Sequence, residues 1–242
     1  MTENKKEKLQ IPTLEENHYY LFNKDFDQST TGDAMKFIIE RNLMIKDKPK
    51  MIKMIFNSYG GDMCSAFALI DTMKGSSIPI HTYGLGCIAS CGLMAFIAGE
   101  KGKRYVTRNT SILSHQFSWG TVGKEHELMA SVKEFDNSSK RMLEHYIKCT
   151  GLSEKDIKKY LLPSEDVWLT AKEAVKYISV SKIPNKKKFY KIVEKSKLQS
   201  FQYIKKIKKT PEKEVAKPIE EIDITNLETS MAVDAILRNL SW

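Results

Sequence analysis

The sequence has few cysteines and lacks a long apolar run, and each absence excludes a class of protein. Four cysteines among 242 residues are too few for a disulfide framework. The longest weakly polar run, residues 86–98, is shorter than the ~20 residues that a membrane helix needs. No apolar segment follows the charged first ten residues, so a secretory signal is not expected. We therefore expect a cytoplasmic protein without a membrane partner.

The net charge of +9 is concentrated near the C-terminus. Residues 182–217 hold 13 lysines against three glutamates, whereas residues 1–181 are close to neutral. Aromatic residues such as Phe189 and Tyr203 are interleaved with these lysines, and this combination can bind nucleic acid. The stretch has almost no arginine and no base-reading motif. We favour a solvated extension, with nucleic-acid binding as the alternative.

Changes in composition divide the chain into a polar arm (1–18), a body (19–182) and a lysine-rich extension (183–242). Within the extension, residues 225–240 place apolar side chains near helical spacing, which fits a docking peptide or a surface helix. In the body, apolar runs and helical periodicities alternate, which favours an α/β fold with a largely parallel sheet. The expected strands are 19–26, 51–56, 78–85, 103–107, 111–114 and 167–169, and the expected helices are 32–44, 63–74, 90–99, 124–149, 152–162 and 171–177.

Two expected strand-to-helix turns are built from small residues. In the first, NSYGGD (57–62), paired glycines allow positive φ and let a backbone N–H approach a ligand oxygen, although ordinary tight turns use the same pattern. In the second, GCIASCG (86–92), Ser90 stands at the first turn of an apolar helix, where the helix field stabilises an oxyanion. The commonest role of serine there is N-capping, so Ser90 alone does not indicate catalysis.

His115 in SILSHQF gives Ser90 a potential base, because imidazole titrates near neutrality and accepts the proton of a serine hydroxyl. The other histidines lie among polar neighbours, on a helix surface (His145) or within a strand (His81). A third group must hold the imidazole in the required tautomer, and Asp166, before a short apolar segment that could partly bury it, is the best candidate. An ordinary loop carboxylate is the alternative for Asp166.

With the order Ser90, His115 and Asp166 along the chain, these motifs resemble those of the ClpP family of serine peptidases. The matching stretches cover residues 19–182 and are NSYGG (57–61), IASCG (88–92), KGKRY (101–105), LSHQF (113–117) and EDVWLTAKEA (165–174). The resemblance implies a ClpP/crotonase-like α/β fold with repeated β-β-α units and a parallel sheet flanked by helices. It also implies a serine-type endopeptidase that hydrolyses peptide bonds of unfolded proteins or peptides.

By the same resemblance, Ser90 is the nucleophile, His115 the general base and then acid, and Asp166 the orienting carboxylate. The backbone N–H groups of Gly61 and Cys91 would form the oxyanion hole. No cofactor is implied, and the four cysteines lack the CxxC spacing of a zinc site, so no metal is expected.

The resemblance further implies assembly into heptameric rings, stacked in pairs around an internal chamber and fed by an AAA+ unfoldase in the cytoplasm. The helix 124–148 would join the rings, and a strand-like segment 117–123 would pair with extended substrate. A bacteriophage origin, with action in the host cytoplasm, is a further analogy.

Departures from the family pattern keep other hypotheses open. Tyr59, Cys91 and Phe117 replace proline, methionine and proline, and residues 1–18 do not match the segment that forms axial loops in the family. One alternative is a catalytically inert scaffold or regulatory subunit with a basic partner-binding tail. A crotonase-like acyl-CoA enzyme, which needs no Ser-His-Asp set, is another. A Cys91 thiol nucleophile is a third.

Overall fold

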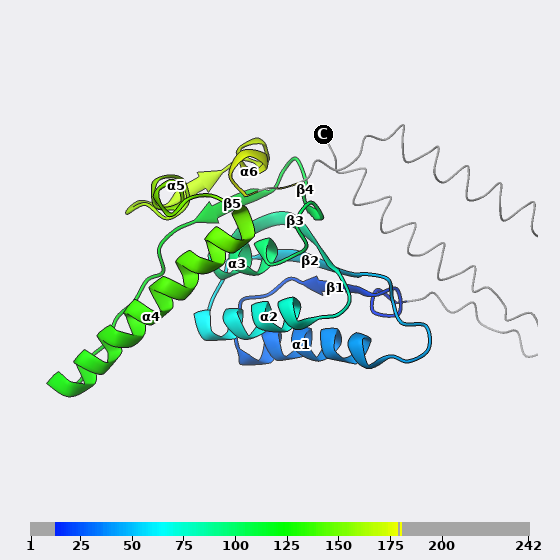
Figure 1. Cartoon of the computed structure of the whole chain (residues 1–242), viewed down its shortest axis with the longest axis horizontal. Coiled ribbons are helices and arrows are strands. Elements are labelled where there is room, and N and C mark those ends of the chain that lie inside the picture. Colours follow the sequence, from blue (N-terminus) through cyan, green and yellow to red (C-terminus); the bar gives the residue numbers. More distant parts are fainter. Residues whose placement is uncertain (1–12, 179, 181–242) are drawn as a thin grey trace, which may run out of the picture. The chain divides into compact units, whose positions relative to one another are not determined.

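The structure, a computed structural model, describes residues 13–178 and residue 180 (Figure 1). Most of the polar arm, the lysine-rich extension and its expected terminal helix lie outside these residues. Residues 13–17 form a turn in which the Asn17 N–H donates to the Leu14 carbonyl at 3.1 Å. Residues 18–182 form a separate compact unit, which holds all the helices and strands named below.

A six-stranded sheet lies at the centre of this unit. Its strand order is β1-β2-β3-β5-β6, with β4 also paired to β3. Every pair is parallel except β5 with β6, which is antiparallel. The expected α/β fold with a mostly parallel sheet is therefore confirmed. The strands are β1 (Tyr19–Phe22), β2 (Ile52–Ser58), β3 (Ile80–Ala89), β4 (Arg104–Val106), β5 (Ser111–Ser114) and β6 (Val167–Leu169).

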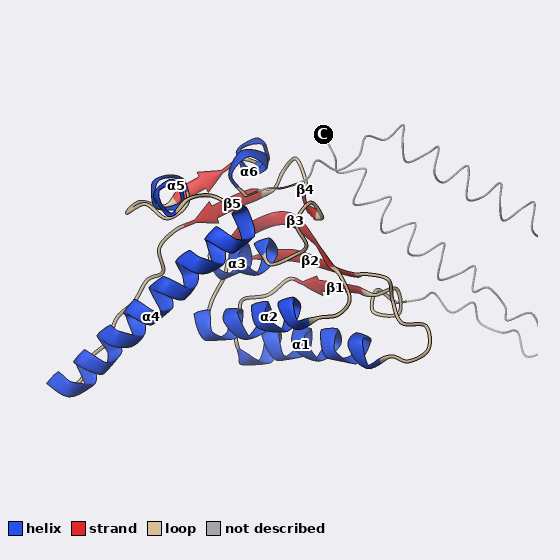
Figure 2. Ribbon diagram, viewed as in Figure 1, coloured by secondary structure: helices blue, strands red, loops and turns tan. Residues whose placement is uncertain are grey.

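Helices flank the sheet, and α1 and α2 pack against each other (Figure 2). Single strands precede α1, α2, α3 and α6, whereas the two strands β4 and β5 precede α4. None of the helices among the described residues is long and apolar enough to cross a membrane. The helices are α1 (Gln28–Leu43), α2 (Met63–Gly75), α3 (Cys91–Ile97), α4 (Glu125–Thr150), α5 (Glu154–Tyr160) and α6 (Ala171–Tyr177).

Side-chain caps set the starts of the helices that lead away from the sheet. The Asp27 carboxylate accepts the Thr30 N–H at 2.7 Å, so α1 begins four residues before the expected start at residue 32. The Asp62 carboxylate accepts the Ser65 N–H at 2.7 Å and begins α2 directly after the paired glycines. The Gly-rich turn is therefore held at a fixed point between β2 and α2.

Strand β3 is longer than expected, because it continues through Gly86 to Ala89 instead of ending near residue 85. Gly86 has φ +62°, and a Cβ there would lie 2.6 Å from the Asn57 side-chain oxygen. That oxygen accepts the Cys87 N–H at 3.0 Å, at a point where the register between β2 and β3 shifts. The irregularity therefore extends the strand and delivers it directly to Ser90.

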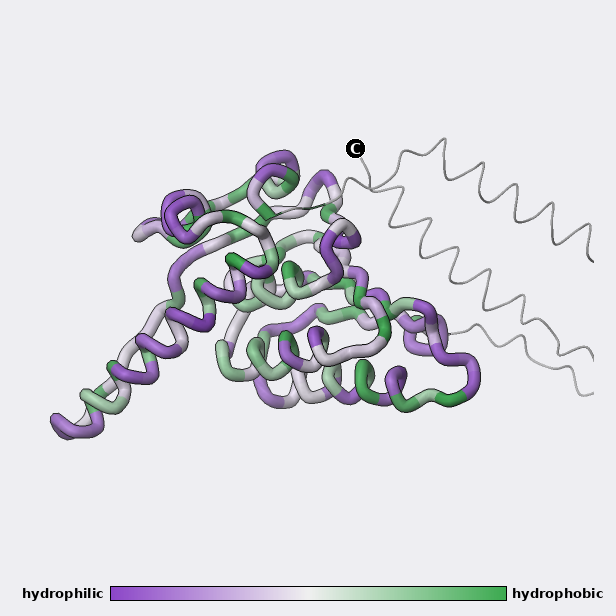
Figure 3. Tube along the Cα trace, in the orientation of Figure 1, coloured by the Kyte–Doolittle hydropathy of each residue, from purple (hydrophilic) through white to green (hydrophobic). Residues whose placement is uncertain are grey.

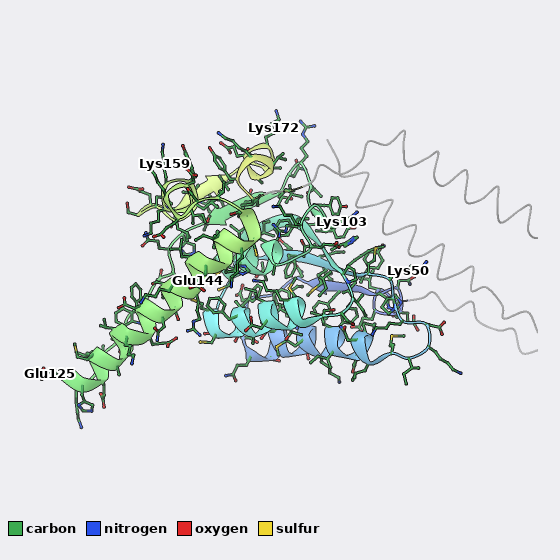
Figure 4. All side chains as sticks on the ribbon, in the orientation of Figure 1. Lys50, Lys103, Glu125, Glu144, Lys159 and Lys172 are labelled. Carbon is green, nitrogen blue, oxygen red and sulfur yellow. The ribbon has the colours of Figure 1, made fainter. Side chains whose placement is uncertain are left out.

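Helix α4 is anchored at only one end and projects away from the rest of the unit (Figure 1). Its buried side chains begin at Ser138, and Figure 4 shows Glu125 at the far tip. Hydrophilic residues predominate along α4 (Figure 3), but Met129 and Val132 expose apolar side chains. The segment 117–123 that precedes it is not paired in the sheet. Its expected pairing with an extended substrate stays a prediction.

The anchored end of α4 contains a buried histidine that the sequence places on the surface. His145 is only 4% exposed, and its Nε2 lies 2.8 Å from the Met94 carbonyl of α3. Its Nδ1 lies 3.0 Å from the Lys74 ammonium of α2, which can only donate. The imidazole is therefore neutral, accepting at Nδ1 and donating at Nε2. Burial, helped by the Lys74 charge, lowers the pKa of His145 to about 4.

This arrangement predicts acid sensitivity above the range in which carboxylates titrate. The unfolded chain takes up a proton on His145 near pH 6.5 and the folded chain only near pH 4, so the stabilisation is present above pH 6.5 and falls between those values. The full loss is about 3 kcal/mol. Denaturant unfolding at a series of pH values measures this loss. Between about pH 4 and pH 6.5, the free energy of unfolding should depend less steeply on pH in a His145→Gln variant than in the wild type.

Burial also lowers the pKa values of His18 and His81, so these residues contribute to the pH dependence of the wild type as well. Only a comparison of variants isolates the contribution of His145. The matched control is His126→Gln, since the His126 side chain is 78% exposed. It should keep the wild-type pH slope. An equal slope in His145→Gln and wild type would contradict the assignment of the acid sensitivity to His145.

Candidate active site

Ser90 is the single residue between the end of β3 and the start of α3. Its backbone has φ 55° and ψ −123°, a strained conformation for a residue with a side chain. The Ser90 N–H donates to the Leu113 carbonyl of β5 at 3.0 Å, and the Ser90 carbonyl accepts from the Met94 N–H at 3.1 Å. Such a sharp strand-to-helix turn lifts a serine hydroxyl clear of the sheet.

The Ser90 hydroxyl does not serve as a helix cap. Ser90 occupies the N-cap position of α3, but its side chain makes no capping hydrogen bond. The side chain is partly exposed, whereas all seven residues of α3 that follow are buried. The N-cap alternative therefore fails, and the hydroxyl remains available for other chemistry.

The Gly-rich turn packs directly against this serine. A Cβ at Gly60 would lie 2.7 Å from the Ser90 Cβ and 3.2 Å from the Cys91 backbone nitrogen, so only glycine fits there. The Cys91 thiol lies 3.2 Å from the Gly61 carbonyl and joins the two turns on the other side. Two motifs that are 30 residues apart in sequence thus form one structural element.

Two backbone N–H groups at this junction are candidates for binding an oxyanion. Gly61 forms a parallel bridge with Phe26, in which the Phe26 N–H donates to Gly60 and the Asp62 N–H donates to Phe26, both at 2.7 Å. The Gly61 N–H takes no part in that bridge, and the Cys91 N–H is in the first turn of α3. Within residues 13–178, neither group donates to a backbone carbonyl, and both N–H groups approach the Cys91 sulfur.

His115 and Asp166 are brought together by the pairing of β5 with β6. His115 directly follows β5 and Asp166 directly precedes β6, and the antiparallel register pairs Ser114 with Val167. The His115 Nδ1 lies 3.8 Å from the Asp166 Oδ1. The Asp166 side chain is 64% exposed, so the expected partial burial of this carboxylate is wrong. It lies at the start of an edge strand, where few groups surround it.

Ser90 and His115 follow the ends of two neighbouring parallel strands, β3 and β5, in which Ala89 pairs with Leu113. The carboxyl edge of a parallel sheet is where α/β proteins bind ligands. The other histidines lie elsewhere: His18 precedes β1, His81 pairs with Glu100 at 3.4 Å, His126 is on the outer half of α4 and His145 is buried. His115 is therefore the candidate base at this edge.

The cysteines do not offer an alternative nucleophile or metal site. Burial raises the pKa of Cys91 to about 11, so its thiol stays protonated near neutral pH and is a poor nucleophile. Burial raises the pKa values of Cys87 and Cys149 as well, and Cys64 is exposed. Among the described residues, no group of histidine, cysteine and carboxylate side chains is arranged to hold a metal ion.

A cavity of about 420 Å³ opens directly beyond His115. The rings of Phe117 and Phe135 pack together at its wall, with their centroids 5.0 Å apart. The cavity is lined by the two residues that follow His115 in the chain, and its apolar wall suits an apolar side chain of a ligand. The lining residues are Gln116, Phe117, Phe135, Met142, Leu143 and Leu162, with Ser139, Lys140, Glu154 and Lys158.

Comparisons with known proteins agree on one family. The family profile described as Clp protease matches residues 18–187. The ATP-dependent Clp protease proteolytic subunit 1 of Corynebacterium jeikeium is 34% identical over 135 residues, which cover 56% of this chain and 71% of the relative. Subunit 2 of Corynebacterium diphtheriae is 34% identical over 135 residues, which cover 56% of this chain and 67% of the relative. Subunit 2 of Chlamydia trachomatis is 32% identical over 142 residues, which cover 58% and 68%.

Proposed function

The chain belongs to the Clp protease family, and on that premise we propose that it is a serine endopeptidase that uses Ser90, His115 and Asp166. The observation that carries the proposal is the strained turn at Ser90, whose hydroxyl does not cap the helix that it begins. Strain of this kind is maintained only where the surrounding structure enforces it, and it occurs preferentially at functional sites. A serine with a purely structural role would have no need of it.

In the proposed mechanism, His115 takes the proton of the Ser90 hydroxyl while the oxygen attacks the substrate carbonyl. The Nδ1 of His115 faces Asp166 at 3.8 Å, which leaves Nε2 for Ser90. The carboxylate favours the tautomer with the proton on Nδ1 and stabilises the imidazolium that forms. His115 then protonates the leaving amine, and water releases the acyl group from Ser90 by the reverse sequence.

The tetrahedral intermediate carries a negative oxygen that needs fixed donors. We assign this role to the N–H groups of Gly61 and Cys91. Neither donates to a backbone carbonyl among the described residues, and the Cys91 thiol, a weak hydrogen-bond acceptor, joins the two turns. Because the donors are backbone groups, cysteine in place of the methionine typical of the family is compatible with the role.

The cavity beside His115 supports a preference among peptide substrates. Its apolar wall favours a large apolar side chain next to the bond that is cleaved. Lys140, Lys158 and Glu154 at the same cavity give it charges of both signs, so they provide no strong selection by charge. We propose that the substrates are unfolded proteins or peptides, read mainly through this one side chain.

The projecting half of α4 supports assembly into a chamber. Trp119, Val122, Met129 and Val132 are exposed on this half and on the segment before it, and a second copy of the chain would cover them. Heptameric rings, a stacked double ring, an AAA+ unfoldase partner and a cytoplasmic location remain proposals from the family. So does the division of the chain into an arm (1–18), a peptidase domain (19–182) and an extension (183–242).

Labelling with a peptidyl phosphonate, which reacts only with an activated serine, tests the proposed function. The purified full chain should form a covalent adduct on Ser90, and a probe with leucine next to the phosphorus should react faster than one with aspartate. His115→Gln should abolish labelling. An assembled, folded wild-type chain without labelling would indicate the inert scaffold, and equal rates for both probes would contradict the role of the cavity.

A further inference from the structure

The segment that carries His115 is fixed on both sides by hydrogen bonds to one short stretch of chain. The Ser114 hydroxyl lies 2.5 Å from the Leu161 carbonyl, and the Gln116 side-chain amide donates to the Leu162 carbonyl at 3.1 Å. Both carbonyls directly follow the end of α5, where helix geometry leaves carbonyl groups without a partner. These bonds therefore join the strand end at His115 to the end of α5.

A buried tyrosine from α4 completes this network. Tyr146 is fully buried, and its hydroxyl lies 3.3 Å from the Ser114 hydroxyl. A hydroxyl has one hydrogen, and that of Ser114 is directed to the Leu161 carbonyl, so Tyr146 must be the donor to Ser114. The result is a directed chain from the Tyr146 O–H to the Ser114 O–H and on to the Leu161 carbonyl. All three residues are buried, so water cannot replace a lost partner.

The same short stretch leads to Asp166. Leu161 and Leu162 are held by the bonds to residues 114 and 116, and Val167 pairs with Ser114 in the sheet. The segment 163–166 therefore spans two points that are both tied to the end of β5. The Asp166 side chain is mostly exposed, so its own packing does little to place it. Its distance to His115 is set by the ties at the ends of this segment.

We propose that Ser114 and Tyr146 are positioning residues that hold His115 and Asp166 in register through this buried hydrogen-bond chain. The proposal rests on the proposed function for its effect on catalysis. Neither side chain lies at the reacting atoms. Removing the Ser114 hydroxyl leaves the Tyr146 hydroxyl and the Leu161 carbonyl unpaired in the interior. Each unpaired group costs free energy until it reaches another hydrogen-bond partner. Because Leu161 leads into the segment that carries Asp166, a shift of its carbonyl displaces Asp166 as well.

The kinetic test compares Ser114→Ala with wild type in hydrolysis of a leucine-containing peptide. A small displacement of catalytic groups lowers kcat strongly, so we expect kcat to fall about tenfold or more while KM changes by less than about twofold. Tyr146→Phe should lower kcat by a smaller factor, again with little change in KM.

A second readout does not depend on activity. Hydrogen–deuterium exchange of the backbone amides of residues 164–166, followed by mass spectrometry, reports how firmly the segment that carries Asp166 is held. Exchange should be faster in Ser114→Ala and in Tyr146→Phe than in wild type. Ser114→Thr keeps the hydroxyl and should retain the wild-type exchange rate and kcat. Ser111→Ala, in the same strand but exposed, is the matched control and should change neither.

The proposal is overturned if folded Ser114→Ala keeps the wild-type kcat and the wild-type exchange rate of residues 164–166. Tyr146→Phe removes a single oxygen, so it decides the question by the same criteria if Ser114→Ala does not fold. Absence of Ser90 labelling in the wild type would refute the proposed function, but faster exchange at residues 164–166 in the variants would still support the positioning of this segment by Ser114. Failure of the two proposals is therefore distinguishable.

Discussion

Replacing Ser90 by alanine is expected to lower kcat/KM for peptide hydrolysis by about 10⁴-fold or more. The loss of the attacking oxygen removes the covalent pathway, and the remaining groups supply only binding and oxyanion stabilisation. The unfolding temperature should stay within a degree or two of the wild-type value, about the range expected when no buried contact is lost. The Ser90 hydroxyl makes no capping bond, so its removal costs only its weak hydrogen bond with the Cys91 thiol. Peptide hydrolysis and thermal unfolding of the same preparation check both statements.

A Ser90→Gly variant separates the effect of losing the hydroxyl on activity from the effect of backbone strain on stability. The φ of 55° at Ser90 is as unfavourable for alanine as for serine, but not for glycine. We therefore expect Ser90→Gly to be as inactive as Ser90→Ala but more stable than it by about 1 kcal/mol. Ser111→Ala, at an exposed serine of β5, is the control for activity. Appreciable hydrolysis by both Ser90 variants would refute the assigned nucleophile and favour a mechanism of the crotonase kind.

Replacing Gly61 by alanine is expected to have the largest effect on folding, a loss of about 3 kcal/mol or more. Gly61 has φ +140°, and a Cβ there would lie 2.4 Å from the Phe26 carbonyl oxygen. The atom in its way belongs to the backbone, so no rotation of a side chain relieves the clash. The bridge between Phe26 and Gly61 would have to open, and chemical denaturation measures the cost.

Gly32→Ala is the matched control for that substitution. Gly32 lies inside α1, and a Cβ there would have no atom within 4 Å. Alanine should therefore stabilise the chain by about 0.5–1 kcal/mol, because it loses less backbone entropy in a helix than glycine. Opposite signs for the two substitutions are the expected pattern. A Gly61→Ala variant as stable as wild type would contradict the close approach to Phe26.

Local sequence patterns predicted much of the fold and where the site residues lie. Strand and helix alternation predicts a parallel sheet, and the small residues at 57–62 and 86–92 predict the two turns that the structure brings together. His115 and Asp166 are placed correctly beside strands, because short apolar segments flank each of them. Their catalytic roles, and those of Ser90, Gly61 and Cys91, stay predictions until they are tested.

The remaining features depend on partners far away in the sequence. Gly86 looks like a strand end, and only the Asn57 side chain on the neighbouring strand explains why β3 continues. His145 looks like a surface residue of a polar helix, but Met94 and Lys74 provide partners that allow its burial. The positive φ of Ser90 has no local signal, because serine fits ordinary caps equally well. Tertiary hydrogen bonds decided each case.

The free half of α4 has a consequence for how the chain's own helicity depends on concentration. Residues 125–137 have no buried side chain, and their main tertiary contacts are the rings of Phe117 and Trp119 on Phe135. The helix–coil balance of this stretch is therefore close to that of a short peptide, which is marginal in water at such a length. Contact with another copy would supply the missing burial and shift that balance toward helix. Dilution should then melt this half while the rest of the chain stays folded. If the chain assembles as proposed, part of its secondary structure is a property of the assembly.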